Sequence, residues 1–170
     1  MSFTVRPEVA KDVEGIRKVH IAAFPTAAEA DLVERLRDDH DSEISLVAEQ
    51  AGWIVGHVLL SRMQVVGDGV PIFALGLAPV AVLPEQQRTG IGSMLIRGAL
   101  ALAREAEEEM IFVLGDTDYY GRFGFSAAIA TPFASPYACP YLMALALNDM
   151  VMPASGQAAY ASAFARLGDS

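Results

Sequence analysis

The sequence predicts an α/β (α+β) fold in one domain, because strand-like and helix-like segments follow one another along the chain. Short apolar runs of strand length, such as residues 110–115 and 141–147, lie between segments whose apolar residues recur at helical spacing. Two further runs, residues 44–49 and 53–66, are joined across the short turn 50–52, which predicts an antiparallel hairpin. A chain of 170 residues is large enough to bury one sizeable core.

The first part of the chain predicts one strand and two helices. Residues 3–7 alternate apolar and polar side chains and stop at a proline, as a half-buried first strand would. Residues 12–24 carry apolar side chains three and four positions apart, which predicts a helix. Thr26 and Glu29 have the spacing of a capping box and would start a second helix, residues 26–36.

The middle of the chain predicts strands with two irregular points. Gly56 lies inside the strand 53–66, where a glycine indicates a bulge or a close backbone approach. The long strand 72–83 contains Pro79. Because a proline removes one hydrogen bond from a ladder, we expect a bulge or a splay of the strand at Pro79.

The strand that ends at Leu83 passes through a polar turn into a helix that begins at Gly90. The first amides of a helix have no internal partner and carry partial positive charge, so the turn predicts an anion-binding site at the helix start. The glycines at 90 and 92 would let a phosphate approach the main chain. The turn is not a Walker-type loop, because the chain contains no Gly-Lys pair, and Leu95 stands where a dinucleotide fingerprint has its third glycine.

The segment after this helix carries a second group of polar residues. The acidic run 107–109 ends the helix, and we assign it no function. Asp116 or Asp118 can cap a short helix that presents Tyr119 and Tyr120.

The remaining chain is predicted with less regularity. Gly124 lets the chain reverse into a sixth strand, and residues 141–147 predict the last strand. Residues 158–164 fit either a short helix or an edge strand, and the sequence does not decide between them.

The composition excludes several classes of protein. The chain is 53% hydrophobic but has no apolar run near the ~20 residues of a membrane span, and its N-terminus lacks signal-peptide features, so we expect a cytoplasmic protein with no membrane partner. Cys139 is the only cysteine, which excludes an intramolecular disulfide framework. The net charge of −9 argues against nucleic-acid binding and could favour a cationic amine substrate, while Arg88 and Arg97 would supply local positive charge.

Two motifs in this sequence resemble those of the GNAT superfamily of N-acetyltransferases. Gln87-Arg-Thr-Gly90-Ile-Gly92, after Val80-Ala-Val82, resembles the acyl-CoA pyrophosphate loop of that family. The run from Tyr120 to Phe125 resembles its second signature, and the longer run 114–125 looks like that of a branch of small, single-domain acetyltransferases. The resemblance covers residues 3–148, so we expect an acetyltransferase domain at 1–148 and an extension, 149–170, packed on the same domain.

The resemblance implies a fold and a cofactor site. A mixed, mostly antiparallel sheet of six to seven strands would carry helices on both faces, with strands four and five splayed. The main chain of Val80, Ala81 and Val82 would then pair with the pantetheine arm, as an added strand does. The loop and helix start would hold the pyrophosphate of acetyl-CoA through Gln87, Arg88, Thr89, Gly90, Ile91, Gly92 and Ser93.

The resemblance also implies the reaction, which is acetyl transfer from acetyl-CoA to a primary amine of a small molecule or peptide. Tyr120 would protonate the CoA sulfur, with its neighbour Tyr119 as the alternative. The sequence does not identify the general base, because residues 74–83 and 111–115 contain no carboxylate. Asp116 is the nearest acid and is the candidate, although it also suits helix capping. A water relay or an amine that is already neutral would remove the need for it.

Three further residues have side chains that suit a place in such a site: His57, Cys139 and Phe24. His57 has a side chain suited to a base, but a strand histidine with one face toward solvent is more often structural. Cys139 could form an acyl-enzyme, but a lone cysteine in apolar surroundings more often packs. Phe24 would lie at the wall of the acceptor cleft by resemblance, with core packing as the alternative.

Two further function classes stay open at this point. One is an acyl-CoA-binding module that has kept the cofactor-binding site but has no catalytic activity, and the other is a protein-interaction domain with no cofactor. The sequence also allows a homodimer.

Overall fold

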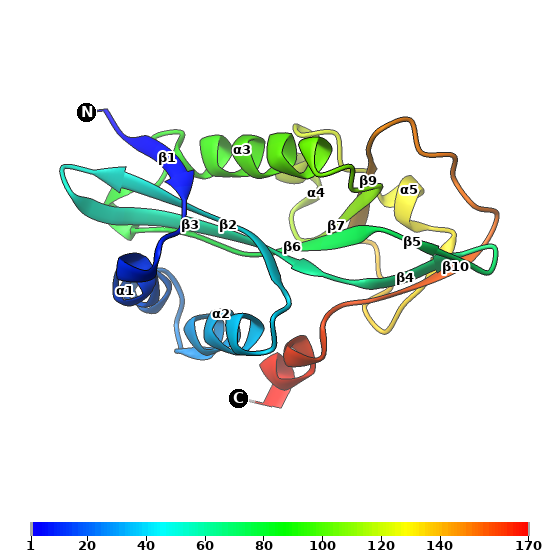
Figure 1. Cartoon of the computed structure of the whole chain (residues 1–170), viewed down its shortest axis with the longest axis horizontal. Helices are drawn as coiled ribbons and strands as arrows, with labels where there is room; N and C mark the ends of the chain where they lie inside the picture. Colours follow the sequence, from blue (N-terminus) through cyan, green and yellow to red (C-terminus); the bar gives the residue numbers. More distant parts are fainter. Residues whose placement is uncertain (1, 170) are drawn as a thin grey trace.

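The structure, a computed structural model, describes residues 2–169 and contains a six-stranded mixed sheet (Figure 1). All neighbouring strands in it are antiparallel except β6 and β7, which are parallel. This confirms the predicted mixed, mostly antiparallel sheet. In spatial order the strands are β1 (Thr4–Pro7), β2 (Ser42–Gln50), β3 (Trp53–Arg62), β6 (Ala74–Val82), β7 (Met110–Leu114) and β9 (Leu142–Ala146).

Helices cover both faces of this sheet, as predicted (Figure 1). Helix α3 (Ile91–Glu105) lies on one face, and its stripe of buried residues, which includes Leu95 and Ala99, packs against the strands. Helices α1 (Val13–Ala23) and α2 (Ala28–Asp38) cover the other face, where Ile16 and Leu36 pack with Leu59. None of the helices in residues 2–169 is long and apolar enough to cross a bilayer.

A second, smaller sheet extends one end of the molecule. Its strands in spatial order are β5 (Val70–Ile72), β4 (Gln64–Gly67), β10 (Gly156–Ala159) and β8 (Phe133–Ala134). The predicted long strands 53–66 and 72–83 are therefore each divided, after Arg62 and at Phe73, because β4 leaves the main sheet to pair with β10. Periodicity could not show this division, because the buried alternation continues through Met63 and Val65.

The region that the sequence left undecided contains both alternatives in succession. Residues 156–159 form β10, and a 3₁₀ helix, η3 (Ser162–Asp169), follows it. Phe164 of η3 joins the buried cluster of Leu32 and Leu36 on α2.

Two local predictions were wrong. Among the described residues no strand begins directly after Gly124. Apart from one bridge between Ser126 and Ala144, the chain there forms the short helix α5 (Ala127–Ala130), because the Ser126 hydroxyl accepts a hydrogen bond from the Ala128 amide at 3.1 Å and caps it. The capping box at Thr26 does not form either. Helix α2 starts one residue late, with Ala27 as its N-cap, and the Thr26 hydroxyl accepts a hydrogen bond from the Ala28 amide at 3.2 Å from the position before it.

The acidic residues that follow α3, 107–109, are not all exposed to solvent. Glu108 is buried, and both of its carboxylate oxygens accept hydrogen bonds from the Arg62 guanidinium, at 2.6 and 2.8 Å. This bidentate pair ties the chain after α3 to the end of β3.

Candidate active site

The site is built where β6 and β7 part. The two strands pair over Ala74–Gly76 and Met110–Phe112, and no further pairing between them occurs in the described chain. On its other edge β6 pairs with β3, but its register shifts between Leu77 and Val80, so that β6 holds one extra residue there. The predicted irregularity at Pro79 is thus confirmed as a bulge, and the edge of residues 80–82 that faces away from β3 is open.

The helix start beside this edge has the form that an anion site needs. Gly90 is the N-cap of α3 with φ +92°, a left-handed conformation that suits glycine, and no side chain among the described residues caps the helix. The first helical hydrogen bond is donated by the Met94 amide to the Gly90 carbonyl, at 3.1 Å. The amides of residues 91–93 therefore lack partners within the helix.

A cavity of about 620 Å³ opens in front of this helix start. All the predicted cofactor-binding residues line it except Thr89 and Ile91. The Thr89 hydroxyl instead donates to the Gln86 carbonyl within the loop, and the Ile91 side chain packs in the core below α3. The loop is closed by the Gln87 side-chain amide, which donates to the Val82 carbonyl at 3.1 Å.

The charged side chains at this cavity are positive, although the chain as a whole has a net charge of −9. Neither aspartate nor glutamate is among the described residues that line it, whereas Arg88 and Arg122 both do. Arg122 was missed by the sequence reasoning, and its guanidinium carbon lies 4.6 Å from the centre of the Tyr119 ring. Arg97, which was expected to supply charge, lies over Phe123 instead and does not line this cavity.

The short helix α4 (Thr117–Gly121) positions the two tyrosines. Asp116 is its N-cap, and its Oδ1 accepts hydrogen bonds from the amides of Asp118, at 2.8 Å, and Tyr119, at 3.2 Å. Asp116 lines neither the 620 Å³ cavity at the α3 start nor a second cavity that lies on the side of α1 and α2. In this structure its carboxylate is occupied with holding α4 in place.

The two tyrosines of α4 face different spaces, although their ring centres lie only 5.0 Å apart. Tyr119 lines the cavity at the α3 start, and a Cβ built on Gly92 would lie 3.2 Å from its hydroxyl oxygen. Tyr120 lines the space where the strands part, and burial, with a smaller effect of Tyr119, raises its pKa to about 12. Tyr120 is therefore a protonated donor at neutral pH.

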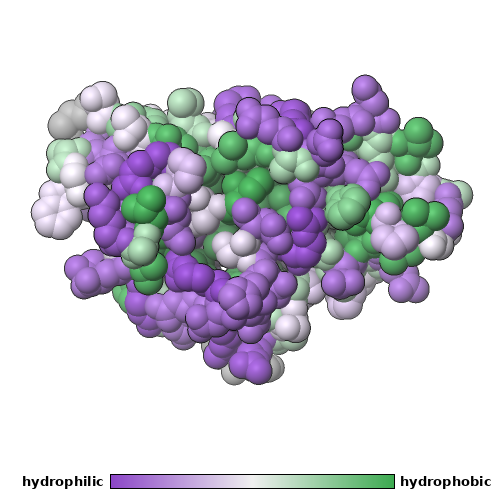
Figure 2. Space-filling view, in the orientation of Figure 1, coloured by the Kyte–Doolittle hydropathy of each residue, from purple (hydrophilic) through white to green (hydrophobic). Residues whose placement is uncertain are grey.

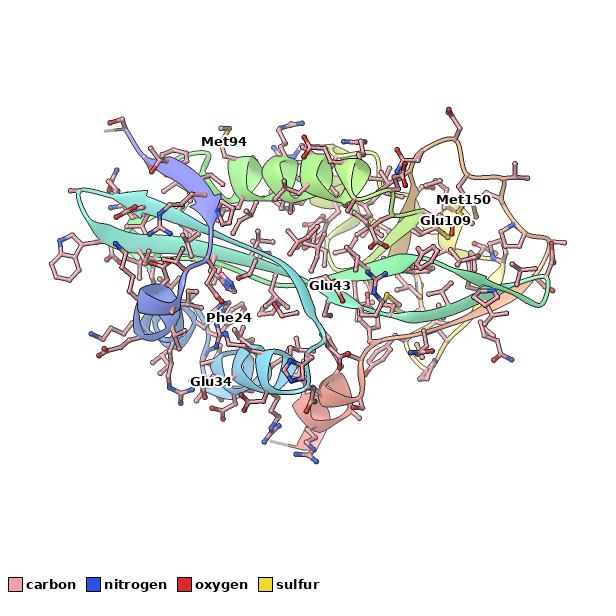
Figure 3. The ribbon with its side chains drawn as sticks, viewed as in Figure 1. Phe24, Glu34, Glu43, Met94, Glu109 and Met150 are labelled. Carbon is pink, nitrogen blue, oxygen red and sulfur yellow. The ribbon has the colours of Figure 1, made fainter. Side chains whose placement is uncertain are left out.

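A second cavity, of about 530 Å³, adjoins the first at Val80. It lies between β6 and the layer of α1, α2 and η3, and includes Tyr120 together with residues 77–80. Phe24, the predicted acceptor-wall residue, also lines it, and Figure 3 shows Phe24 between α1 and α2. Figure 2 shows hydrophilic side chains over much of the helices at the top and bottom of the view, with apolar side chains visible between them and at the end that carries the smaller sheet.

The sequence reasoning missed much of this second wall. Glu29, Tyr160 and Phe164 line it, from α2 and from the C-terminal segment. Glu29 was interpreted as part of a capping box, and residues 158–164 were left undecided between a short helix and an edge strand, so no local signal pointed to these three residues as part of a site.

The remaining candidates lie elsewhere. Cys139 is exposed and lines neither cavity. His57 is fully buried, so the expectation of a face toward solvent was wrong. It is hydrogen-bonded to His20 at 2.8 Å and to Ser45 at 2.8 Å.

Comparison with known proteins places these features in a family. A model described as an acetyltransferase (GNAT) domain matches residues 4–128. The chain is 39% identical over 126 residues to the "uncharacterized N-acetyltransferase YjhQ" of Escherichia coli, an alignment that covers 72% of this chain and 69% of that protein.

Two solved structures are similar over nearly the whole chain. The GNAT family N-acetyltransferase YhbS of Escherichia coli, crystallised with CoA, superposes with a TM-score of 0.88 at 28% identity, covering 96% of this chain and 92% of that one. A GNAT family acetyltransferase of Brucella melitensis, crystallised with acetyl-CoA, gives a TM-score of 0.79 at 36% identity, covering 96% and 98%.

Proposed function

Because the chain belongs to the GNAT family of acetyltransferases, we propose that it moves the acetyl group of acetyl-CoA directly to a primary amine. The observation that supports this most strongly is the pairing of an uncapped helix start with an open strand edge in one cavity that lacks carboxylates. The diphosphate of a CoA molecule would bind at the helix start, and its amide groups would pair with the open strand edge.

The donor groups of the 620 Å³ cavity fit this co-substrate. The amides of residues 91–93 and the guanidinium groups of Arg88 and Arg122 would hold the diphosphate. The main chain of residues 80–82 would pair with the pantetheine amides, which brings the thioester to the point where the two cavities meet at Val80. The complexes of the two structural relatives with CoA and acetyl-CoA support the same assignment.

Acyl transfer then needs a neutral amine, a polarised carbonyl and a proton for the departing sulfur. The nitrogen attacks the thioester carbonyl carbon, the carbon–sulfur bond breaks, and the sulfur takes a proton. Tyr120 is the residue we assign as that proton donor, since it lines the space at the strand parting and its pKa of about 12 keeps it protonated. Tyr119 lies closer to Gly92, which suits contact with the diphosphate.

The role of Asp116 as general base stays a prediction. Its two capping hydrogen bonds support a positioning role for it, because they hold the helix that carries both tyrosines. A cytoplasmic location and a homodimer also stay predictions.

A rival function is an acyl-CoA-binding module without chemistry. Thermal denaturation with and without acetyl-CoA, followed by measurement of CoA release with panels of amines, separates the alternatives. The proposal expects stabilisation, by about 2.7 kcal/mol at 100 times the dissociation constant, together with CoA release that depends on an amine. Stabilisation without release across the panels would favour the binding module, and no stabilisation would refute both.

A further inference from the structure

The 530 Å³ cavity on the α1, α2 and η3 side has an apolar lining with one charged group. Its described residues include the side chains of Leu32, Leu77 and Pro79, and Glu29 is the sole charged residue among them. The volume is within the range of ordinary small-molecule sites, ~300–1,000 Å³.

One wall of this cavity is aromatic. The Tyr137 and Tyr160 rings meet edge to face with centres 5.2 Å apart, and the Tyr160 and Phe164 rings are 5.0 Å apart. Such a wall offers ring faces and edges to another ring, and also attracts a cation. The wall therefore suits an occupant with a flat apolar body.

Two polar atoms of the lining residues are buried without a hydrogen-bond partner among the described residues. They are Oε2 of Glu29 and the hydroxyl oxygen of Tyr160. A buried polar group without a partner is costly, and a carboxylate oxygen is the more costly of the two. Oε2 itself is closed off from solvent, but Glu29 lines the cavity, so a rotation of its side chain would turn the unpartnered carboxylate toward the ammonium group of an occupant.

We infer that this cavity is the acceptor subsite, that it takes a monoamine with an apolar, aryl-sized body, and that Glu29 binds the ammonium group and accepts its proton. The inference rests on the proposed acetyl transfer. Glu29, on helix α2, would thus provide the carboxylate that residues 74–83 and 111–115 of the main sheet lack. Amines with several charges fit poorly, because further ammonium groups would meet apolar walls and no second carboxylate among the described lining residues.

The proton balance of this assignment is simple. The ammonium gives one proton to the Glu29 carboxylate, and the neutral nitrogen attacks the thioester carbonyl carbon. The sulfur receives the Tyr120 proton as the carbon–sulfur bond breaks. The bonded nitrogen loses its surplus proton to water, Glu29 also returns its proton to water, and Tyr120 regains one from water, so the net products are the amide, CoA and one proton.

The test compares two ligands of nearly equal shape. Binding of 2-phenylethylamine and of 2-phenylethanol is measured by calorimetry on the full chain with CoA present. We expect the amine to bind at least tenfold more tightly than the alcohol, and Glu29→Gln to erase this difference. Glu34→Gln is the matched control, because Glu34 lies on the same helix with a 43% exposed side chain and pairs with Arg17 outside the cavity.

A kinetic measurement tests the proton transfer. With 2-phenylethylamine and acetyl-CoA, Glu29→Gln should lose at least tenfold in kcat/KM at pH 7 and recover as the pH approaches the pKa of the amine. The Glu34→Gln profile should follow that of the parent protein. Parallel pH profiles for the Glu29→Gln variant and the parent protein would refute the role of Glu29 as base.

The outcomes separate the inference from the proposed function. If spermidine or a lysine peptide is acetylated while 2-phenylethylamine neither binds nor reacts, the inference falls and the proposed function stands. If 2-phenylethylamine binds in a Glu29-dependent way but no amine is acetylated, the subsite stands and the proposed function falls. Equal binding of amine and alcohol to the parent protein would overturn the inference directly.

Discussion

His20 Nε2 lies 2.8 Å from His57 Nδ1, and both imidazoles are fully buried between α1 and the main sheet. The hydrogen bond continues from His57 Nε2 to the Ser45 hydroxyl, at 2.8 Å, and from that hydroxyl to Glu8 Oε1, at 3.0 Å. Because Ser45 has one hydroxyl proton and gives it to Glu8, His57 Nε2 must donate and its Nδ1 must accept from His20. Both histidines are then neutral, and Nδ1 of His20 is left as an acceptor without a partner among the described residues.

This neutral pair predicts that the protein loses stability in mild acid. Burial lowers the pKa of His20 from 6.5 to about 4, and burial, followed by the charges of His20 and Arg37, lowers the pKa of His57 well below 6.5. Between these values the unfolded chain holds more protons than the folded one, so stability present above pH 6.5 is lost as the pH falls toward 4. His20 alone accounts for about 3 kcal/mol of this loss.

Urea denaturation at pH 7.5 and at pH 5 measures the effect. The variant His20→Gln should show a shallower dependence on pH in this range, whereas His40→Gln, at an exposed position, should keep that of the parent protein. An unfolding free energy that is constant from pH 7.5 to 5 would contradict the prediction.

Tyr120→Phe should lower kcat by about 10²-fold or more, because general acid catalysis typically contributes this much. The affinity for acetyl-CoA should stay within about twofold, since Tyr120 does not line the cavity at the helix start. Tyr119→Phe is the matched control, and it should keep kcat nearly unchanged. A larger loss of kcat in Tyr119→Phe than in Tyr120→Phe would reverse the assignment.

Gly92→Glu should weaken acetyl-CoA binding by more than tenfold. The new side chain would lie at the helix start, against Tyr119, and would place a negative charge in the cavity. Met94→Glu adds the same charge to the same helix, but Met94 is 52% exposed and lines no part of that cavity (Figure 3). Calorimetry with acetyl-CoA should show near-normal affinity for Met94→Glu, and an equal loss in both variants would point to net charge as the cause.

Asp116 can be tested with two substitutions that separate capping from base catalysis. Asparagine keeps an oxygen that accepts from the amides of Asp118 and Tyr119, while alanine removes it. If capping is its role, Asp116→Asn should keep most of the activity, and Asp116→Ala should lose about 1 kcal/mol of unfolding free energy and some activity. Equal and severe loss of kcat in both variants, with normal stability in Asp116→Asn, would indicate that the carboxylate is the base.

Glu108→Gln should destabilise the fold by about 3 kcal/mol, because it removes the charge that the partly buried Arg62 guanidinium pairs with. Arg62 stays charged when the partner is lost, because an arginine guanidinium keeps its proton throughout the pH range in which the fold is measured. Glu107→Gln changes the neighbouring, exposed residue of the same acidic run and should cost less than about 0.5 kcal/mol. Thermal or urea denaturation of the two variants gives the comparison.

The cofactor side of the molecule could be predicted from the sequence because its signals are local. Pro79, Gly90 and Gly92 each impose a backbone feature at their own position, and the structure has the bulge and the uncapped helix start at those places. Six strands and three main helices likewise follow from periodicity within single segments.

Most of the 530 Å³ cavity, the proposed acceptor side, could not be predicted, because apart from Phe24 and Tyr120 its residues meet only through tertiary packing. Glu29 and Phe164 are far apart in the chain, and each has an ordinary local pattern. The division of the long strands was hidden for a similar reason, since β10 provides the edge that draws β4 out of the main sheet. Arg122 was overlooked within a motif that had been interpreted through its tyrosines and glycines.

The bulge at Pro79 separates two parts of the chain that can change independently in evolution. The residues that line the 620 Å³ cavity, the proposed acetyl-CoA site, all lie within one stretch, residues 80–122, whereas much of the proposed acceptor wall comes from residues 24–32 and 137–167. Substitutions in residues 24–32 and 137–167 would change the amine specificity and leave the binding of acetyl-CoA unchanged. Proteins that keep the stretch 80–122 and differ in those two segments should therefore share a donor and differ in their acceptors.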